Sequence, residues 1–263
     1  MKSVKIEKFG SPDVLKVENI EIGKPQSNEV LIKNLSIGIN YIDTYHRTGL
    51  YPIPLPSGIG LEACGVIEEL GPEVKLFKVG DRVSHASMPI GAYSEKHIMP
   101  ENKLVPVPDG VSDEVASCVT LKGITAEYLL HRAYPLKKGD KVLYHAAAGA
   151  LGQILCPWAN SIGAEIIGTV GSKEKEEIAK KNGCHHVINY TDKNFVEEVE
   201  KIVGKNGIDV VYDGVGLKTF EGSIEVLKIR GMMVAFGNAS GYVDKIDVKK
   251  HINAKGLFFT RPS

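Results

Sequence analysis

KVLYHAAAGALGQILCPWANSIGAEIIGTVGSKEK, residues 141–175, is the stretch that decides the fold of this chain. An apolar run leads into the pattern Ala147-x-Gly149-x-x-Gly152, a helical period follows, and a second apolar run closes the unit. A pyrophosphate needs bare backbone N–H groups at a helix N-terminus, where the helix dipole also attracts negative charge. Gly149 would allow that approach, and Gly152 would let the helix pack closely on the strand. The stretch therefore predicts a dinucleotide-binding unit.

The end of the second apolar run indicates which dinucleotide is bound. An NAD site places an Asp or Glu about 20 residues beyond the glycines, on the adenosine ribose. Here the run ends in GTVGSKEK (168–175), which has no carboxylate at its tip but carries Ser172, Lys173 and Lys175. A dianionic 2′-phosphate suits a hydroxyl and cations. This favours NADPH over NADH, while the alternative that the lysines only begin a solvated helix stays open.

The rest of the second half repeats the alternation of strand and helix. From Lys138 onward the apolar runs KVLYHA, EIIGTVG, HHVIN, DVVYDGVG and GMMVAFG are separated by stretches with a helical period. Strands that alternate with helices form a parallel sheet covered on both faces. We therefore predict an α/β fold in which residues 123–263 form a doubly wound Rossmann domain with a parallel sheet.

The first half has a different pattern. Short runs alternate apolar and polar residues between Gly and Pro turns, as in VLKVENIEI (14–22), EVLIKNLSIGIN (29–40) and ACGVIEELG (63–71). This pattern predicts a β-rich domain, a small barrel or folded sheet, over residues 1–122. Residues 111–133 are helical in composition and join the two regions.

The composition excludes several classes of protein. Lys and Arg (32) balance Asp and Glu (32), so the chain lacks the basic footprint of a nucleic-acid or membrane-surface binder. No apolar run approaches the roughly 20 residues of a membrane helix. Four cysteines stand singly, which argues against disulfides and predicts a reducing, cytoplasmic location. Cys64, Cys118 and Cys156 have apolar neighbours and are expected in the core.

Motifs along essentially the whole chain carry a family resemblance. They are GINYIDTYHRTGLY (38–51), LPSGIGLEACGVIEELG (55–71), GAYSEK (91–96), LKGITAEYLL (121–130), HAAAGALGQ (145–153), VINY (187–190), YDGVG (212–216) and GMMVAFGNASG (231–241). With these motifs the chain resembles the zinc-free NADPH:quinone oxidoreductases of the medium-chain dehydrogenase/reductase superfamily. The resemblance implies a GroES-like first domain, NADPH as cofactor, and reduction of a quinone or a related electron-poor acceptor by hydride or electron transfer.

The resemblance also bears on the C-terminus and the assembly. Family members run on past the residues that end this chain, GLFFTRPS (256–263), and return to the first domain. We therefore expect this return to be missing and the chain to be a fragment. The resemblance implies a homodimer formed across the edge of the Rossmann sheet near Gly256–Thr260.

Two positions separate this chain from the zinc-dependent branch of the superfamily. Zinc enzymes that resemble it carry a Cys ligand where Asn40 stands, and a Gly-His-Glu where Gly60-Leu61-Glu62 stands. Zinc needs three or four N, S or O side chains that converge tetrahedrally. With Asn40 and Leu61 in place two ligands are lost, so we expect a metal-free site.

The resemblance implies a substrate site lined by Asn40, Asp43, Tyr45 and Tyr51 near the nicotinamide. Asn40 and the two tyrosine hydroxyls could donate hydrogen bonds to the oxygen of a reduced quinone. The alternative, that Tyr45 and Tyr51 only pack beneath a loop, stays open.

The resemblance also places the cofactor contacts, on the linking helix, the glycine loop and the ends of the later strands. They are Asn40, Lys122, Gly123, Thr125, Ala148, Gly149, Ala150, Leu151, Gly152, Gly171, Ser172, Lys175, Tyr190, Gly214, Phe236, Gly237, Asn238, Ser240, Phe259, Thr260 and Arg261. Ala148 to Gly152 would hold the pyrophosphate, and Gly171, Lys175 and Tyr190 would surround the 2′-phosphate. Phe236 to Ser240 would flank the nicotinamide ribose, and the backbone near Phe259 to Arg261 would meet the carboxamide.

Two other functions remain open. One is an NADPH-dependent reductase of activated carbon–carbon double bonds in enones or alkenals, on the same scaffold. The other is a catalytically silent relative that binds NADPH or RNA, although the balanced charge argues against RNA.

Overall fold

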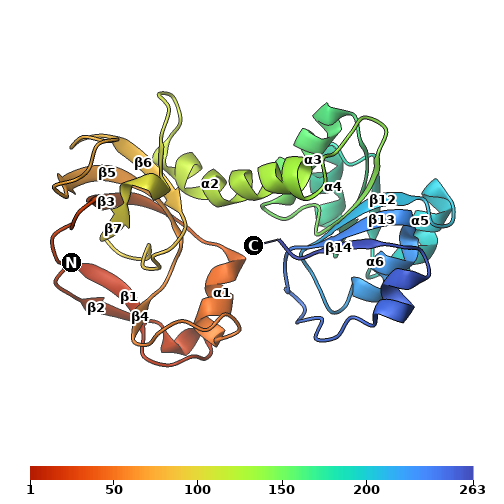
Figure 1. Ribbon diagram of the computed structural model, residues 1–263, viewed down its shortest axis with the longest axis horizontal. Helices are drawn as coiled ribbons and strands as arrows, with labels where there is room; N and C mark the ends of the chain where they lie inside the picture. Colours follow the sequence, from red (N-terminus) through yellow and green to blue (C-terminus); the bar gives the residue numbers. More distant parts are fainter. Residues whose placement is uncertain (263) are drawn as a thin grey trace. The chain divides into compact units, whose positions relative to one another are not determined.

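The computed structural model describes residues Met1 to Pro262. The chain divides into two compact units, Met1–Leu121 and the part from Lys122 onward (Figure 1). Within the described residues no helix is both long enough and apolar enough to cross a membrane.

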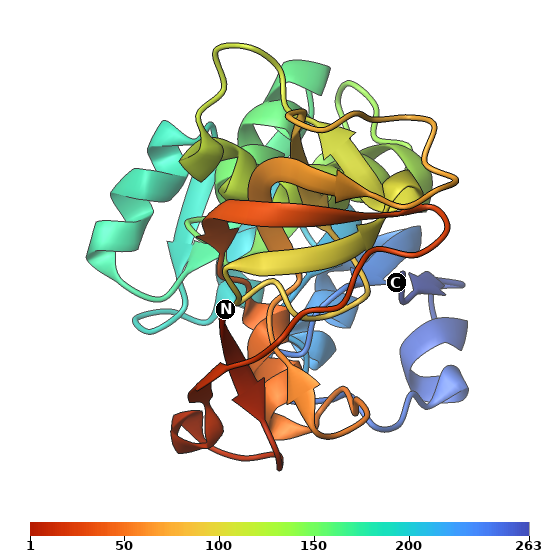
Figure 2. The ribbon, with the colours of Figure 1, turned by 90° about the vertical axis from the view of Figure 1, so that its left-hand side faces the viewer.

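The first unit consists of two antiparallel sheets and one helix (Figure 2). One sheet has the strand order β2-β1-β4 and the other the order β7-β3-β5-β6-β8. The elements are β1 (Lys2–Ile6), β2 (Lys16–Asn19), β3 (Glu29–Gly38), α1 (Tyr41–Thr48), β4 (Ser57–Gly58), β5 (Glu62–Leu70), β6 (Arg82–Ala86), β7 (Lys96–Pro100) and β8 (Leu104–Pro106), with short 3-10 turns at Pro12–Val14 and Glu101–Lys103.

The alternation in these strands builds the core of the first unit. Val30 and Ile32 of β3 are fully buried and pack with Ile67, Val83 and Met99 from three neighbouring strands. Successive side chains of a strand point to opposite faces. Leu31, between them, is also buried, and Lys33 is the first residue of β3 that is exposed. The β-rich first domain predicted from this alternation is confirmed.

The second unit is built on a six-stranded sheet with the order β11-β10-β9-β12-β13-β14, in which every pair is parallel. Its elements are β9 (Lys141–His145), α3 (Gly152–Ile162), β10 (Glu165–Val170), α4 (Lys173–Lys181), β11 (His186–Asn189), α5 (Phe195–Val203), β12 (Ile208–Asp213), α6 (Phe220–Val226), β13 (Leu227–Ala235) and β14 (Phe258–Thr260), with π-helical turns at Leu129–Ala133 and Val248–Asn253. The strand order reverses between β9 and β12, which is the doubly wound arrangement predicted from the sequence.

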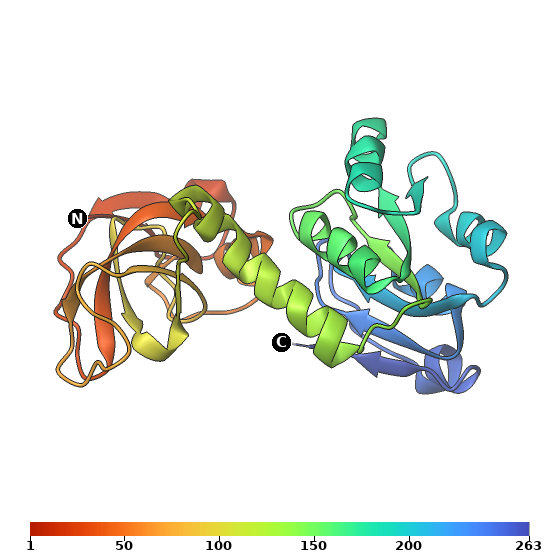
Figure 3. The same cartoon turned by 90° about the horizontal axis from the view of Figure 1, so that it is seen from above.

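Helices cover both faces of this sheet (Figure 3). In β9, Val142 and Tyr144 pack with α3 and α4 on one face, whereas Leu143 packs with α5 and α6 on the other. Strands buried on both faces need apolar residues at every position, because the pleat sends alternate side chains to opposite layers. This explains the continuous apolar runs in the second half of the sequence.

The linking helix α2 (Asp113–Tyr128) starts in the first unit and ends in the second. The prediction that Cys118 lies in the core is wrong, because Cys118 is exposed, while Cys64 and Cys156 are buried as expected. Ala116 and Ser117 form the buried side of the helix, and Val119, next to Cys118, is exposed. An apolar neighbourhood in sequence does not reveal which face of a helix packs.

Candidate functional site

The glycine loop lies between the end of β9 and the start of α3. A Cβ atom at Gly152 would lie 2.3 Å from the carbonyl oxygen of Ala147, so only glycine allows α3 to approach the loop this closely. At Gly149 the nearest atom to an added Cβ is the Ala146 oxygen at 3.0 Å, and the residue is exposed. Gly152 therefore allows the helix to pack closely, while Gly149 leaves the exposed side of the loop free of a side chain.

The backbone of this loop suits an anion. Among residues 1–262, the N–H groups of Ala150 and Leu151 find no acceptor, and they lie at the N-terminus of the eleven-residue helix α3. Exposed N–H groups at a helix N-terminus bind phosphate because the helix dipole adds favourable charge. The loop residues Ala148 to Gly152 thus fit a pyrophosphate.

The ends of β10 and β11 bring four predicted residues together. A Cβ at Gly171 would lie 2.7 Å from the hydroxyl oxygen of Tyr190, so these two residues are in contact. Ser172 is the N-cap of α4, and its hydroxyl accepts a bond from the Lys175 N–H at 3.4 Å. The hydroxyl groups and the helix N-terminus form a polar surface that suits a 2′-phosphate.

One carboxylate lies at this surface. Hydrogen bonds from the backbone N–H of Glu174 and from the Ser172 hydroxyl lower the pKa of Glu174. Its negative charge opposes that of a bound phosphate, so Lys175 has to offset it. Within the described chain no carboxylate pairs with the Lys175 ammonium group, which is exposed.

Two loops meet at the ends of β12 and β13. A Cβ at Gly237 would lie 2.4 Å from the oxygen of Gly214, so the loops touch at these glycines. The Ser240 hydroxyl donates to the Val215 oxygen at 2.8 Å and accepts from the Lys218 N–H at 3.0 Å. Ser240 therefore fastens one loop to the other.

Phe236 and Asn238 lie in the second of these loops and are largely covered. The ring of Phe236 stacks on Tyr144 with 6.3 Å between centroids and 14° between planes. Asn238 is buried. The side chain of Phe236 thus packs onto the sheet.

The last predicted contacts lie on and after the edge strand β14. Phe259 pairs with Met233 and packs edge-on against Phe220 at 6.4 Å, and Thr260 pairs with Val234. The guanidinium of Arg261 donates to the Ala235 oxygen at 3.1 Å. These residues therefore lie beside the end of β13, at the same edge of the sheet as the glycine loop.

Lys122, Gly123 and Thr125 lie in the second half of α2 and are half-buried. Space is open around the Cα of Gly123. Their predicted contacts with the cofactor remain predictions.

In the first unit, Asn40 and Asp43 form a capping box at the start of α1. The Asn40 N–H donates to Asp43 Oδ2 at 2.9 Å, and the Asn40 amide Nδ2 donates to Glu62 Oε2 at 2.8 Å. Asp43 Oδ2 also accepts from the Tyr93 hydroxyl at 2.7 Å. Burial raises the pKa of Asp43, although the hydrogen bonds from Tyr93 and Asn40 oppose this. Asp43 thus holds α1 and Asn40 in place.

Tyr45 and Tyr51 contact each other, with ring centroids 5.0 Å apart at 61°. Tyr41 packs edge-on against Tyr45 at 5.4 Å and is itself exposed. Tyr45 is buried and Tyr51 is partly exposed. Asn40 and Asp43 thus lie at the N-terminal end of α1, whereas Tyr45 lies within the helix and contacts Tyr51 just beyond its C-terminal end.

Three residues that hold the candidate site residues of the two units were not among the predicted ones. Glu62 is fully buried and accepts from both Asn40 and the Leu121 N–H, at 2.7 Å for the latter. Tyr93 orients Asp43, and Asp213 lies beneath the loop that carries Gly214. Each lies in one of the motifs that carry the family resemblance. A carboxylate with largely apolar neighbours in such a motif is expected to be buried and hydrogen-bonded, and this signal could have identified Glu62 and Asp213.

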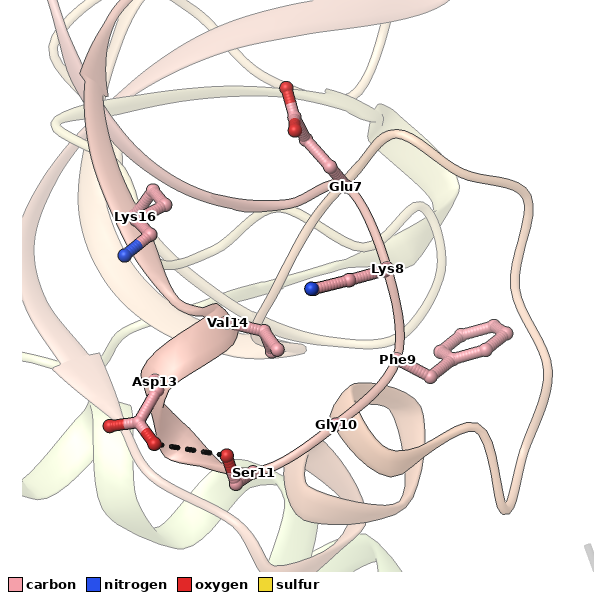
Figure 4. A pocket seen from close by; sticks show the side chains of 8 residues that line it. All are labelled: Glu7, Lys8, Phe9, Gly10, Ser11, Asp13, Val14 and Lys16. Carbon is pink, nitrogen blue, oxygen red and sulfur yellow. Dashed lines mark hydrogen bonds between the residues drawn. The ribbon is translucent and has the colours of Figure 1, made fainter.

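A hollow of about 490 Å³ lies elsewhere in the first unit. Figure 4 shows the side chains that line it. A single segment, residues 7–16, lines it, and the Lys8 side chain points into it. None of the predicted site residues takes part.

The residues at the zinc positions of related enzymes have no suitable donors. The Asn40 amide nitrogen donates to Glu62, and Leu61 offers only hydrocarbon. Across residues 1–262 no three His, Cys, Asp or Glu side chains gather closely enough to hold a metal ion.

Known protein families match both units. Residues 26–109 match the alcohol dehydrogenase GroES-like domain, and residues 150–262 match the zinc-binding dehydrogenase family. The GroES-like and Rossmann assignments made from the sequence are thereby confirmed.

Individual relatives match almost the entire chain. A quinone oxidoreductase of Pseudomonas aeruginosa is 44% identical over 263 residues, 100% of this chain and 81% of that protein. A 2-haloacrylate reductase of a Burkholderia species is 46% identical over 98% of this chain and 80% of its own length. The crystal structure of Escherichia coli quinone oxidoreductase complexed with NADPH has a TM-score of 0.97 at 44% identity and covers 100% of this chain and 81% of that one. The chain therefore belongs to the quinone oxidoreductases of the medium-chain dehydrogenase/reductase superfamily.

Proposed function

We propose that this protein reduces quinones with NADPH. The observation that carries the proposal is the exposed glycine loop at the start of α3, which joins a polar surface at Ser172 and Lys175 along one edge of the sheet. Relatives named quinone oxidoreductase, one of them crystallised with NADPH, support the same activity. The proposed division of labour gives the cofactor to residues 123–263 and the substrate to residues 1–122.

The second unit would hold NADPH by groups already described. Ala148 to Gly152 would bind the pyrophosphate, and Ser172, Lys175 and Tyr190 the 2′-phosphate. NADPH, when bound, supplies the hydride for reduction.

The first unit would orient the acceptor and stabilise charge on its oxygen. Asn40 Nδ2 carries two hydrogens, and because one is donated to Glu62, the second is fixed in direction. The Tyr45 and Tyr51 hydroxyls would donate to the same oxygen. Asp43 would act indirectly, by capping α1 and holding Asn40. A reduced quinone oxygen is a stable anion, so hydrogen-bond donors suffice and we propose that no metal takes part.

The same scaffold supports a second candidate, an NADPH-dependent reductase of activated carbon–carbon double bonds. The relative of 46% identity is named a 2-haloacrylate reductase, and a haloacrylate contains such a double bond. Quinone reduction is the better supported of the two, because several relatives with 44–45% identity carry that name.

We also propose a homodimer and a cytoplasmic location. β14 is the edge strand of the parallel sheet, and half of the Phe258 side chain is exposed on it, which suits pairing with a second copy. All four cysteines are free, as in a reducing compartment. The net charge of zero gives no reason to propose a nucleic-acid partner.

The test of the proposed function is to follow oxidation of NADPH and of NADH separately, with an ortho-quinone, an enone or no acceptor. Faster turnover of the quinone with NADPH is expected, unchanged by a metal chelator. Preference for the enone would move the assignment to double-bond reduction, and loss of activity on chelation that zinc restores would contradict the metal-free site. NADPH binding without turnover of either acceptor would favour the silent relative.

Replacing Lys175 by alanine should weaken NADPH binding about tenfold, the effect of losing roughly one charge-assisted hydrogen bond to phosphate, and leave NADH binding unchanged. Titration of each dinucleotide measures both dissociation constants. Lys181→Ala, at the other end of α4, is the control and should change neither. Equal losses for NADPH and NADH would remove Lys175 from the 2′-phosphate site.

A further inference from the structure

A buried polar cluster lies beneath the loops at the carboxyl edge of the parallel sheet. It consists of His145, Thr169, Asp213, Thr219 and Ser223, which are all at most 7% exposed. They come from the ends of β9, β10 and β12 and from the start of α6. Burial of polar groups costs folding free energy unless each group is hydrogen-bonded, so the side chains of this cluster are expected to bond to one another or to the backbone.

The carboxylate of Asp213 is the centre of this cluster. Oδ1 accepts from the N–H groups of Val215 at 2.7 Å and Gly216 at 2.9 Å. Oδ2 accepts from the Thr219 hydroxyl at 2.7 Å and the Ser223 hydroxyl at 3.2 Å. The Asp213 side chain thus fixes the backbone of residues 215–216, just after β12, and the start of α6 at Thr219 and Ser223.

The loop after β13, residues 236–240, is hydrogen-bonded to the loop after β12, residues 213–216. The backbone oxygen of Asp213 accepts from the Phe236 N–H at 2.8 Å, and the oxygen of Gly214 accepts from the Ala239 N–H at 3.2 Å. The oxygen of Val215 accepts from both the N–H and the hydroxyl of Ser240, each at 2.8 Å. A shift of residues 213–216 would therefore be passed on to residues 236–240.

His145 ties the cluster to the neighbouring strands. Its Nδ1 lies 2.9 Å from the Thr169 hydroxyl and its Nε2 2.9 Å from the Ser223 hydroxyl. Burial lowers the pKa of His145, although the charge of Asp213 opposes this, so the ring is neutral and bridges two hydroxyls. On the adenosine side, Gly171 and Tyr190 have no direct hydrogen bond to Asp213 among the described residues. The link to that side is indirect, through Ser223, His145 and Thr169.

We propose that Asp213 is a positioning residue that sets the loops for the nicotinamide half of NADPH and leaves the adenosine half untouched. This inference rests on the proposed function. Asp213 has no exposed surface, so it can affect a ligand only through the segments it holds: residues 214–216, the loop 236–240 bonded to them, and the start of α6. The two halves of the cofactor site should therefore respond differently to its replacement.

The test compares Asp213→Asn with the wild type in binding NADPH and adenosine 2′,5′-bisphosphate, which carries only the adenosine half. In the variant an amide NH2 group faces N–H or O–H donors, so the dissociation constant of NADPH should rise about tenfold or more. That of the bisphosphate should stay within about twofold, because its loop is held separately. Thr219→Val, which removes one donor to Asp213, should act in the same direction more weakly and serves if Asp213→Asn fails to fold.

Asp209→Asn is the matched control. It lies on the same strand at the opposite end, where its carboxylate accepts from the Lys141 N–H at 2.7 Å and pairs with Lys228. It should lower the unfolding temperature without changing either affinity. Equal weakening of both ligands by Asp213→Asn and Thr219→Val, or no weakening of NADPH, overturns the positioning role. Wild-type protein that binds neither ligand would instead contradict the proposed function itself.

Discussion

Gly149→Val should abolish NADPH binding while the second unit stays folded. The added side chain would project from the exposed loop that carries the N–H groups of Ala150 and Leu151, where the pyrophosphate is expected. A Cβ at Gly149 meets only the Ala146 oxygen, at 3.0 Å, and the residue is exposed, so the loop can accept it by a small shift. We expect the dissociation constant to rise on the order of 100-fold or more, because phosphate binding at a helix N-terminus needs direct access to these groups.

The measurement is titration of NADPH together with thermal unfolding of the same samples. Gly152→Val is the structural contrast, because its Cβ would lie 2.3 Å from the Ala147 oxygen and α3 could not pack. It should lose both binding and stability. Gly23→Val, at an exposed site with open space around it, should change neither. Gly149→Val protein that binds NADPH within about threefold of wild type would remove the glycine loop from the site.

Much of the fold could be predicted because each unit repeats one local pattern. The continuous apolar runs of β9, β10 and β12 follow from burial on both faces of a parallel sheet. The positions of Gly149, Gly152 and Ser172 follow as well, since Gly149 lies in the loop between a strand and a helix, Gly152 begins that helix and Ser172 is the N-cap of the next one. Local rules of backbone geometry are legible in a sequence.

The side-chain network of the site could not be predicted in the same way. The bond from Asn40 to Glu62 spans 22 residues and that from Tyr93 to Asp43 spans 50. The bond from His145 to Ser223 spans 78. Such pairs are created by strand register and helix placement, which no local pattern encodes. The same limit explains Cys118, whose side of α2 is set by what the helix packs against.

His85 and His97 in the first unit should make its stability fall as the solution is acidified. Their ring centroids lie 5.1 Å apart, and His85 Nε2 and His97 Nδ1 are buried with no hydrogen-bond partner in the described chain. Burial lowers the pKa of His85 to about 4, although the hydrogen bond to the Leu61 oxygen opposes this. Burial, followed by the charge of His85, lowers the pKa of His97 to about 3. Both rings are therefore neutral in the folded protein.

The direction of the effect follows from proton uptake. An unfolded histidine has a pKa near 6.5, so the unfolded chain binds protons at these two positions below about pH 6.5. In the folded unit the same two histidines bind protons only near pH 4 and pH 3, respectively. Stability is therefore complete above pH 6.5 or so and falls below it. Between roughly pH 7 and pH 5 we expect each histidine to lower the unfolding free energy by about 2 kcal/mol.

Hydrogen exchange of peptides from β3 and β5 measures this loss within the first unit, because these strands carry its core. His97→Gln, which stays neutral at every pH, should remove about half of the pH dependence whatever it does to stability at neutral pH. His131→Gln is the control, since His131 is exposed and lies in the second unit. If His97→Gln kept the full slope, the pair would have to be protonated or hydrated in the fold. That result would assign the acid sensitivity to another buried group of the same unit, His46, whose pKa is also lowered by burial. Asp43 would oppose it, because its pKa is raised by burial and its protonation favours the folded state as the pH falls.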